Sequence, residues 1–350
     1  MKQVLLRLAA LAALVLTLAL PAAAQQPEIT RQTTLRQLRQ KLAHSGYYTY
    51  CKELTPLEIP VWQDRTLEQY MNKTLVDDSV KAMNLVLEND RSGIQVAWNV
   101  YPEQEIAAKP VLGEVQLYYF PSDRMDGKYA LVVPGNASTI TSEMEEGGSA
   151  AAQLHELGYT VFVLRYRSFL NAGDNAPLED LGRAVQFLTR NAEQFRIRPE
   201  HYALVAFSSG GHLAGLFANK ELGWGRFNVP KPGALLMAYP VVNFSVLKPV
   251  YHVIMDTDRA EWRYYWSNLS DVVTDDYPPV FFWSGKDDTI LPLMDADLQS
   301  PALEKALQDH AIPYRRILFA NAGHGIGTGN GTDAEGWLKT AVQFWEEQTK

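Results

Sequence analysis

The sequence predicts an α/β fold in which helices flank a mostly parallel sheet of eight strands. From about residue 95 onward, short runs of β-branched and aromatic residues alternate with amphipathic segments. This alternation is typical of parallel strands joined by helices. The expected strands cover residues 93–100, 114–120, 129–133, 160–166, 202–207, 234–239, 280–283 and 314–319.

Two apolar stripes predict helices that pack on this sheet. Their members recur every three or four residues, the spacing of one helical face. The first stripe comprises Leu178, Leu181, Val185, Leu188, Ala192 and Phe195. The second comprises Leu338, Ala341, Val342 and Trp345, and it predicts a C-terminal helix that closes the fold.

The first 24 residues have the composition of a signal peptide. Lys2 and Arg7 precede an apolar run over residues 8–20, and Ala22 and Ala24 supply a small-residue cleavage site. The run is shorter than the roughly 20 apolar residues of a spanning helix. We therefore expect cleavage after Ala24 and a secreted or periplasmic protein without a membrane span.

The rest of the chain divides by pattern into an extension and one large domain. Residues 25–92 contain helical segments and no convincing strand, which predicts an N-terminal helical extension. Whether it pads the sheet or leans over a functional site stays open at this point. Residues 93–350 form the main domain, and residues 241–279 are longer than the usual connection of about two to six residues. This stretch is a candidate cap insertion.

Composition excludes several classes of protein. The chain is 47% hydrophobic, enough for a sizeable core, and its formal net charge of -8 opposes binding to nucleic acid. Its single cysteine, Cys51, cannot form a disulfide within the chain or supply a zinc site with several thiolates. No metal-ligand spacing or phosphate loop is visible, so we expect no metal and no cofactor.

A serine at the junction of a strand and a helix is the first sign of catalysis. Ser208 follows an apolar strand, with Ala206 two positions before it and Gly210 two positions after it. A nucleophile elbow needs very small residues at these two places because its turn is tight. The alternative, Ser209, would place Phe207 in one of them. Ser208 is therefore the candidate nucleophile.

The base and the acid follow in the chain order typical of α/β hydrolases, which is serine, acid, histidine. His324 lies between two glycines in the loop after the last strand, and we expect it to be the general base. His212, one turn past Ser208, is expected to pack beneath the elbow instead. Asp287 and Asp288 both follow the strand at 280–283, and we favour Asp288 as the acid.

Two backbone sites are candidates for the oxyanion hole. One is the amide of Ser209, at the start of the helix that follows the elbow. The other lies after the strand at 129–133, where this fold keeps a glycine-rich loop, and Gly135 and Asn136 occupy it here. One donor of this kind contributes roughly 3 kcal/mol where it has been measured.

From about residue 113 to its end, the chain resembles bacterial α/β-hydrolase esterases of the acetyl-xylan-esterase-like and feruloyl-esterase-like groups. The resemblance implies hydrolysis of acyl esters, often on carbohydrate, with the catalytic residues placed as above. It rests on the segments 131–135, 146–147, 157–159, 162–167, 210–214, 238–240, 278–279, 288–292 and 323–325. Ala206 departs from the common glycine of the elbow, and Asn136 begins a stretch that replaces a run of glycines.

The candidate cap carries the candidate specificity residues. Trp262, Tyr264, Tyr265 and Trp266 cluster there, and aromatic faces suit sugar rings or aryl acyl groups, although a cap also needs a core of its own. Two other functions stay open: a serine peptidase of the prolyl-oligopeptidase-like type, and a non-catalytic binding module. The chain before residue 95 is too short for the propeller of such peptidases.

Overall fold

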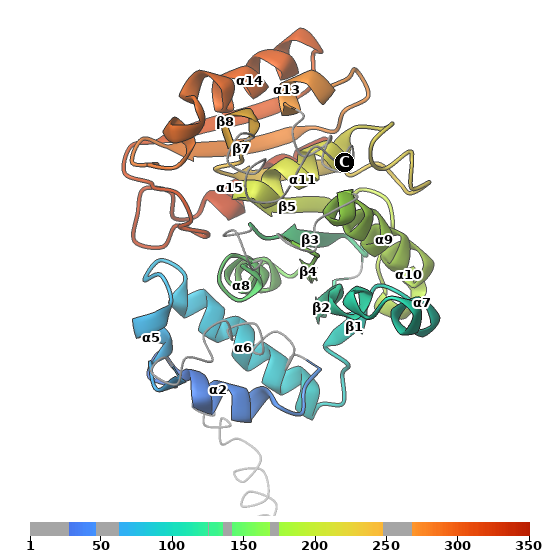
Figure 1. Ribbon diagram of the computed structural model, residues 1–350, viewed down its shortest axis with the longest axis vertical. Helices are drawn as coiled ribbons and strands as arrows, with labels where there is room; N and C mark the ends of the chain where they lie inside the picture. The colour runs from blue at the N-terminus through green and yellow to red at the C-terminus, as the bar shows by residue number, and fades with distance from the viewer. Residues whose placement is uncertain (1–27, 47–62, 125, 136–141, 169–174, 248–267) are drawn as a thin grey trace, which may run out of the picture.

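The computed structural model describes residues 28–46, 63–124, 126–135, 142–168, 175–247 and 268–350 (Figure 1). Its strands are β1 Ala97–Asn99, β2 Gln116–Phe120, β3 Tyr129–Val133, β4 Thr160–Arg165, β5 Ala203–Phe207, β6 Ala234–Ala238, β7 Val280–Gly285 and β8 Tyr314–Phe319. Its α-helices are α2 Leu35–Leu42, α5 Leu67–Tyr70, α6 Val76–Arg91, α7 Glu103–Ala108, α8 Gly148–Glu156, α9 Ala176–Arg190, α10 Ala192–Phe195, α11 Ser208–Ala218, α13 Leu269–Val272, α14 Ser300–Asp309 and α15 Trp337–Gln348. The short 3-10 and π helices are η1 Pro110–Glu114, η2 Glu143–Gly147, η5 Ser245–Leu247, η7 Leu291–Met294 and η8 Ala296–Leu298.

The strands form one eight-stranded sheet in the order β1-β2-β4-β3-β5-β6-β7-β8. β2 runs antiparallel to both of its neighbours, and every pairing from β4 to β8 is parallel. The predicted fold, a mostly parallel sheet of the α/β-hydrolase type, is therefore confirmed. The carboxyl ends of parallel strands meet at one edge of a sheet, and open α/β sheets bind their ligands beyond that edge.

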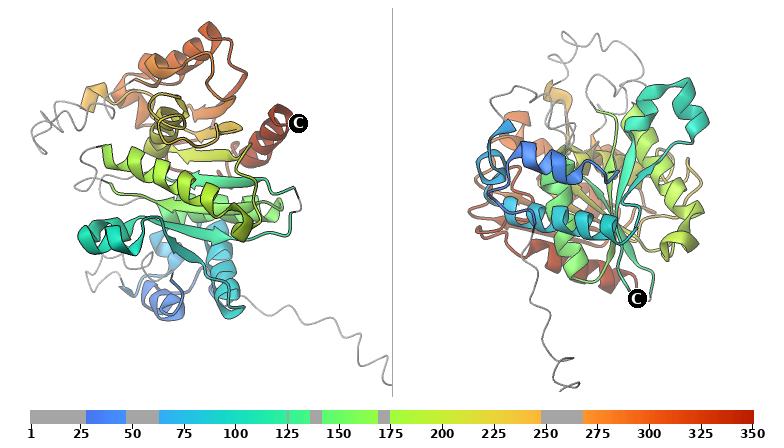
Figure 2. Two further views of the ribbon diagram at one scale, coloured as in Figure 1. Left: turned by 90° about the vertical axis from the view of Figure 1, so that its right-hand side faces the viewer. Right: turned by 90° about the horizontal axis from the view of Figure 1, so that it is seen from below.

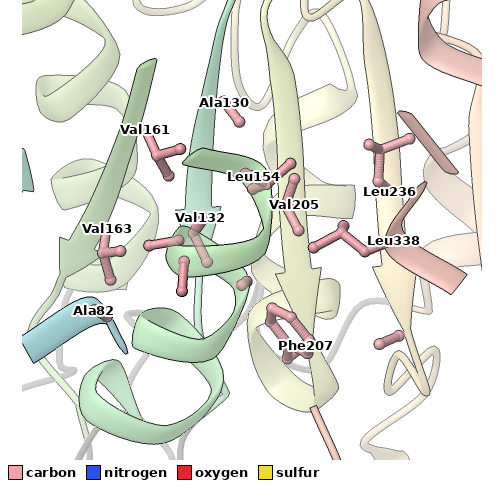
Figure 3. Packing of buried hydrophobic residues seen from close by; sticks show 14 of the residues in the cluster. Ala82, Ala130, Val132, Leu154, Val161, Val163, Val205, Phe207, Leu236 and Leu338 are labelled. Carbon is pink, nitrogen blue, oxygen red and sulfur yellow. The ribbon is translucent and has the colours of Figure 1, made fainter. Parts of the chain in front are cut away.

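Side chains alternate between two hydrophobic cores, one on each face of the sheet. On β4, Val161 and Val163 belong to one core, while Phe162 and Leu164 belong to the other. Helices α6, α8 and α15 cover the first face, and Figure 3 shows the packing of Ala82, Leu154 and Leu338 from these helices. Helices α9, α11 and α14 cover the second face. Both faces are thus buried, as a parallel sheet requires.

The N-terminal helices are packed into the first core and do not stand apart from it. Helices α2, α5 and α6 lie together at one end of the molecule, beside α8 (Figures 1 and 2). The turn before α6 also touches the loop that follows β8. Asn72 Nδ2 lies 3.5 Å from the Gly325 carbonyl oxygen, and a Cβ added at Gly327 would lie 2.1 Å from Leu75 Cδ2. This region therefore contacts both the sheet-covering helix α8 and the loop after β8.

The largest differences from the predicted elements concern the first strand and the first apolar stripe. β1 begins at Ala97 because Gly93, at a φ of 77°, ends α6, and the Ile94 amide donates to the Asn89 carbonyl oxygen. The first apolar stripe is divided between α9 and α10, which meet at Asn191. The side-chain amide of Asn191 donates to the Phe187 carbonyl oxygen, a local bond that competes with continuing the helix.

The structure describes the remaining predicted regions only in part. The described ends of the candidate cap, residues 241–247 and 268–279, hold η5 and α13. Residues 1–24, Cys51 and the cap aromatics Trp262, Tyr264, Tyr265 and Trp266 lie outside the described residues. Within the described ranges, the helices are too short or too polar to cross a membrane.

Candidate active site

The turn between β5 and α11 has the geometry of a nucleophile elbow. Ser208 has a φ of 49°, in the left-handed region that non-glycine residues rarely adopt. Gly210 lies against the end of β3: a Cβ there would lie 2.3 Å from the Val133 carbonyl oxygen and 2.4 Å from the Pro134 carbonyl oxygen. Only glycine fits this position, whereas the methyl group of Ala206 is accommodated in the core.

The structure brings the three predicted catalytic side chains together. Ser208 Oγ lies 2.7 Å from His324 Nε2, and His324 Nδ1 lies 2.8 Å from Asp288 Oδ2. Ser208 begins α11 directly after β5, while His324 and Asp288 lie in the loops after β8 and β7, so all three are at the same edge of the sheet. A serine bonded to one imidazole nitrogen and a carboxylate bonded to the other is the arrangement that allows proton transfer from the serine.

Asp288 is the buried member of the two adjacent aspartates. It is 5% exposed, and its Oδ1 accepts hydrogen bonds from the amides of Ile290 and Leu291 at 2.8 and 2.9 Å. Burial by itself would raise the pKa of Asp288, but the hydrogen bond and charge of His324 and the two amides lower this pKa overall. Asp287 is exposed on the same turn. The geometry therefore pairs Asp288, and not Asp287, with His324.

His212 lies beneath the elbow, as expected from its place one turn past Ser208. It is 1% exposed, and its Nδ1 lies 3.2 Å from the Val241 carbonyl oxygen. Its ring packs edge-on against Phe244 with centroids 4.8 Å apart. These contacts give the imidazole a packing role.

The predicted oxyanion donors are placed in different surroundings. Ser209 opens the first turn of α11, where helix N–H groups point out of the helix end. The Gly135 amide lies next to Ser208 but donates to Glu146 Oε2 at 2.7 Å. Its single hydrogen is therefore engaged by a carboxylate. Asn136 lies outside the described residues.

Sequence reasoning gave no role to Glu146 and Tyr239, although both lie in segments that carry the family resemblance. Glu146 is 5% exposed, and Tyr239 donates its hydroxyl hydrogen to Glu146 Oε1 at 2.7 Å. The Tyr239 ring packs on His324, with centroids 4.8 Å apart. Burial raises the pKa of Glu146, while the hydrogen bonds from Tyr239 and Gly135 and the nearby His324 oppose that rise.

The described residues hold no cluster of three or more histidine, cysteine, aspartate or glutamate side chains placed to bind a metal ion. The groups at the candidate site are instead a hydroxyl, an imidazole, two carboxylates and backbone amides. These groups can carry out nucleophilic attack with general acid and base assistance.

Comparison with known proteins agrees with this fold. Residues 117–223 match the BD-FAE family model. The chain is 25% identical over 265 residues to endo-1,4-beta-xylanase B of Butyrivibrio fibrisolvens, covering 72% of this chain and 40% of that protein. It is 23% identical over 257 residues to an acetylxylan esterase of Xylanibacter ruminicola, covering 67% of this chain and 47% of that protein. The chain thus spans less than half the length of these curated relatives.

A solved structure shares the fold. The acetyl ester-xyloside bifunctional hydrolase of Caldicellulosiruptor lactoaceticus superposes with a TM-score of 0.58 at 22% identity, covering 72% of this chain and 95% of that one. The chain thus has the α/β-hydrolase fold. Its predicted resemblance to bacterial esterases of this fold is confirmed: it is related to the BD-FAE family and to proteins that include an acetylxylan esterase.

Proposed function

We propose that this protein is a serine esterase that hydrolyses carboxylic esters through an acyl-enzyme on Ser208. The observation that carries the proposal is the hydrogen-bonded chain from Ser208 Oγ through the His324 imidazole to Asp288. The elbow geometry and the kinship with an acetylxylan esterase support it. A non-catalytic binding module would need neither the strained serine nor the aligned histidine.

In the proposed first half-reaction, Ser208 Oγ bonds to the acyl carbon while its proton passes to His324 Nε2. Collapse of the tetrahedral intermediate breaks the bond to the alcohol oxygen, which takes the proton from His324. Water then attacks the acyl-enzyme, again giving a proton to His324. This proton returns to Ser208 as the carboxylic acid leaves, and Asp288 stabilises the imidazolium each time it forms.

The backbone amide of Ser209 is our first candidate for stabilising the oxyanion, and the amide of Asn136 our second. Gly135 was predicted for the same task, but its N–H already donates to a buried carboxylate. We therefore assign Gly135 to holding the loop in place and leave the oxyanion to Ser209 and Asn136.

We propose an acyl ester on a carbohydrate as the substrate, because the relatives include an acetylxylan esterase and an acetyl ester-xyloside hydrolase. Trp262, Tyr265 and Trp266 are the proposed contacts to the sugar ring, a proposal that rests on sequence.

The proposed site of action is outside the cytoplasm. N-terminal sequencing of protein recovered from the periplasm or medium should begin at Gln25, and a chain that begins at Met1 would contradict export through this signal.

Covalent labelling with a fluorophosphonate tests the activity directly. The purified protein should lose activity toward p-nitrophenyl acetate as it reacts, and mass spectrometry should place the label on the peptide containing Ser208. The Ser208→Ala variant serves as the control. Release of acetate from acetylated xylan without cleavage of prolyl peptides separates an esterase from a peptidase. Absence of labelling in folded protein would favour a binding module.

A further inference from the structure

Glu146 is a buried carboxylate next to the candidate site, and the proposed mechanism does not use it. It lies where η2 passes into α8, on the face of the sheet that also carries the N-terminal helices. Its two oxygens are each engaged. Oε2 accepts the Gly135 amide at 2.7 Å, and Oε1 accepts the Tyr239 hydroxyl at 2.7 Å.

The first contact fixes the loop after β3 against the elbow. A Cβ added at Gly135 would lie 2.8 Å from Glu146 Oε2 and 3.0 Å from Ser208 Cβ. The absence of a side chain thus lets the carboxylate reach the backbone amide. Because Gly135 is in direct contact with the serine, any shift in this loop changes the wall beside the nucleophile.

The second contact reaches the loop that carries the histidine. The Tyr239 hydroxyl donates to Glu146 and at the same time accepts the Gly327 amide at 2.8 Å. Tyr239 itself follows β6 with a φ of 38°, and its ring packs on His324. One hydroxyl therefore connects Glu146 to a residue three positions beyond the histidine and holds the ring beneath the imidazole.

The direction of each hydrogen bond in this network, from donor to acceptor, is determined by the groups that form it. Gly327 and Gly135 can only donate through their N–H groups, so the Tyr239 hydroxyl hydrogen must point toward Glu146. Among the described residues, no lysine or arginine forms an ion pair with Glu146, so its partners are neutral donors. Such buried networks tolerate little rearrangement, because an unmatched donor carries its full desolvation cost.

We infer that Glu146 is a positioning residue for this site: it holds the loop after β3 directly, and the loop after His324 through Tyr239. This inference rests on the proposed hydrolysis, since it assigns Glu146 an effect on turnover by Ser208. Misplacement of reacting groups by about 1 Å can cost about 10²-fold in rate. Loosening these two loops should therefore slow chemistry more than it weakens substrate binding.

The Glu146→Gln substitution tests the inference because glutamine keeps the shape but not the acceptors. If its amide nitrogen faces the Gly135 N–H, two donors oppose each other. If it faces Tyr239, the hydroxyl hydrogen of the tyrosine must turn away. With p-nitrophenyl acetate, we expect kcat per fluorophosphonate-titrated site to fall by about 10²-fold while KM stays within about threefold. Hydrogen exchange at the Gly135 and Gly327 amides should quicken.

Tyr239→Phe is the second variant, and it carries the test alone if Glu146→Gln does not fold. Phenylalanine keeps the ring under His324 and removes both hydrogen bonds of the hydroxyl, to Glu146 and from Gly327, while the Gly135 amide can still donate to Glu146. We therefore expect kcat to fall by about 10-fold. Tyr202→Phe is the matched control. Tyr202 is equally buried and its hydroxyl donates to the Pro230 carbonyl oxygen, at the opposite end of β5 from Ser208. It should leave kcat unchanged.

The outcomes separate this inference from the proposed function. If both variants unfold at lower temperature but keep kcat within about threefold of the parent protein, Glu146 is merely structural and the inference is wrong. If the parent protein neither labels nor turns over ester, the proposed function fails instead. Amide exchange then decides the inference, because unchanged exchange at Gly135 and Gly327 in Glu146→Gln would overturn it.

Discussion

Asp288 and Glu146 are two buried carboxylates at the same site that are held in different ways. Each is 5% exposed. Asp288 accepts a hydrogen bond from the imidazole of His324 and two more from backbone amides. Glu146 accepts one from a backbone amide and one from a tyrosine hydroxyl. The pKa of Asp288 is lowered, whereas burial raises the pKa of Glu146.

The difference reflects the partners of the two carboxyl groups as well as their burial, because burial is the largest influence on the pKa of each. Burial disfavours the ionised form of both carboxyl groups. Only Asp288 is bonded to a side chain that can become a cation, and this partner offsets the burial. Asp288 is thus suited to stabilise positive charge that forms during turnover, and Glu146 to hold neutral groups in place.

Removing the proposed nucleophile or the proposed base has the largest expected effect, because the proposed roles of both carboxylates depend on these two side chains. Ser208→Ala and His324→Ala should each lower kcat by about 10⁶-fold, as in the protease precedent, with the fold intact by circular dichroism. Hydrolysis of p-nitrophenyl acetate measures the loss. Near-native turnover by Ser208→Ala would remove the basis of the comparison.

Removing the charge of Asp288 has the next largest expected effect. Asp288→Asn should lower kcat by about 10⁴-fold, because asparagine favours the wrong imidazole tautomer. Asp287→Asn is the matched control: its side chain is exposed on the same turn, and its kcat should be close to that of the parent protein. A severe loss in the Asp287 variant alone would assign the acid role to the other aspartate.

The opposite pKa shifts predict opposite dependences of stability on pH. Ionised Asp288 contributes stability that is fully present above its unfolded pKa of about 3.9 and is lost as pH falls through its lower folded pKa. Protonated Glu146 contributes stability that is fully present below its unfolded pKa of about 4.3 and is lost as pH rises through its higher folded pKa.

Urea unfolding between about pH 3 and pH 8 tests these two signs. The free energy of unfolding of the parent protein should exceed that of Asp288→Asn by an amount that decreases as the pH falls. The difference in free energy of unfolding between the parent protein and Glu146→Gln should decrease as the pH rises. Differences that change in the same direction for the two variants would contradict the contrast between these carboxylates.

The smallest expected effect concerns the N-terminal contact to the histidine loop. Asn72 is exposed, and its side-chain oxygen also accepts the Thr74 amide at 3.1 Å. Asn72→Ala should lower the free energy of unfolding by about 1 kcal/mol and leave kcat nearly unchanged. Thermal unfolding and ester hydrolysis measure both. A tenfold loss of kcat would contradict this expectation and would mean that the contact affects turnover as the two carboxylates are proposed to do.

Local sequence patterns were enough to predict the sheet and the candidate triad. Most strands are short apolar runs between turn residues, and all eight predicted runs overlap observed strands. Ser208, Asp288 and His324 each lie in a loop directly after such a run, so their order along the chain implied their meeting at one edge.

Glu146 could not be assigned a role in the same way. It lies with Glu143 and Glu145 in an acidic segment at the start of a helix, a composition that is typical of exposed helix ends. Its burial depends on a glycine 11 residues earlier and a tyrosine 93 residues later. The available signal was that Glu146 and Tyr239 lie in segments that resemble esterases. That position alone did not indicate a chemical role for either residue.

The contact of Leu75 with Gly327 has a practical consequence for producing this protein. A shortened recombinant form that starts at residue 117, where the family match begins, would lack the helix that covers α8 and the leucine that supports the loop after His324. It would also lack β1, the edge partner of β2. Anyone trimming the gene for expression, crystallisation or library screening should keep the codons for residues 28–116.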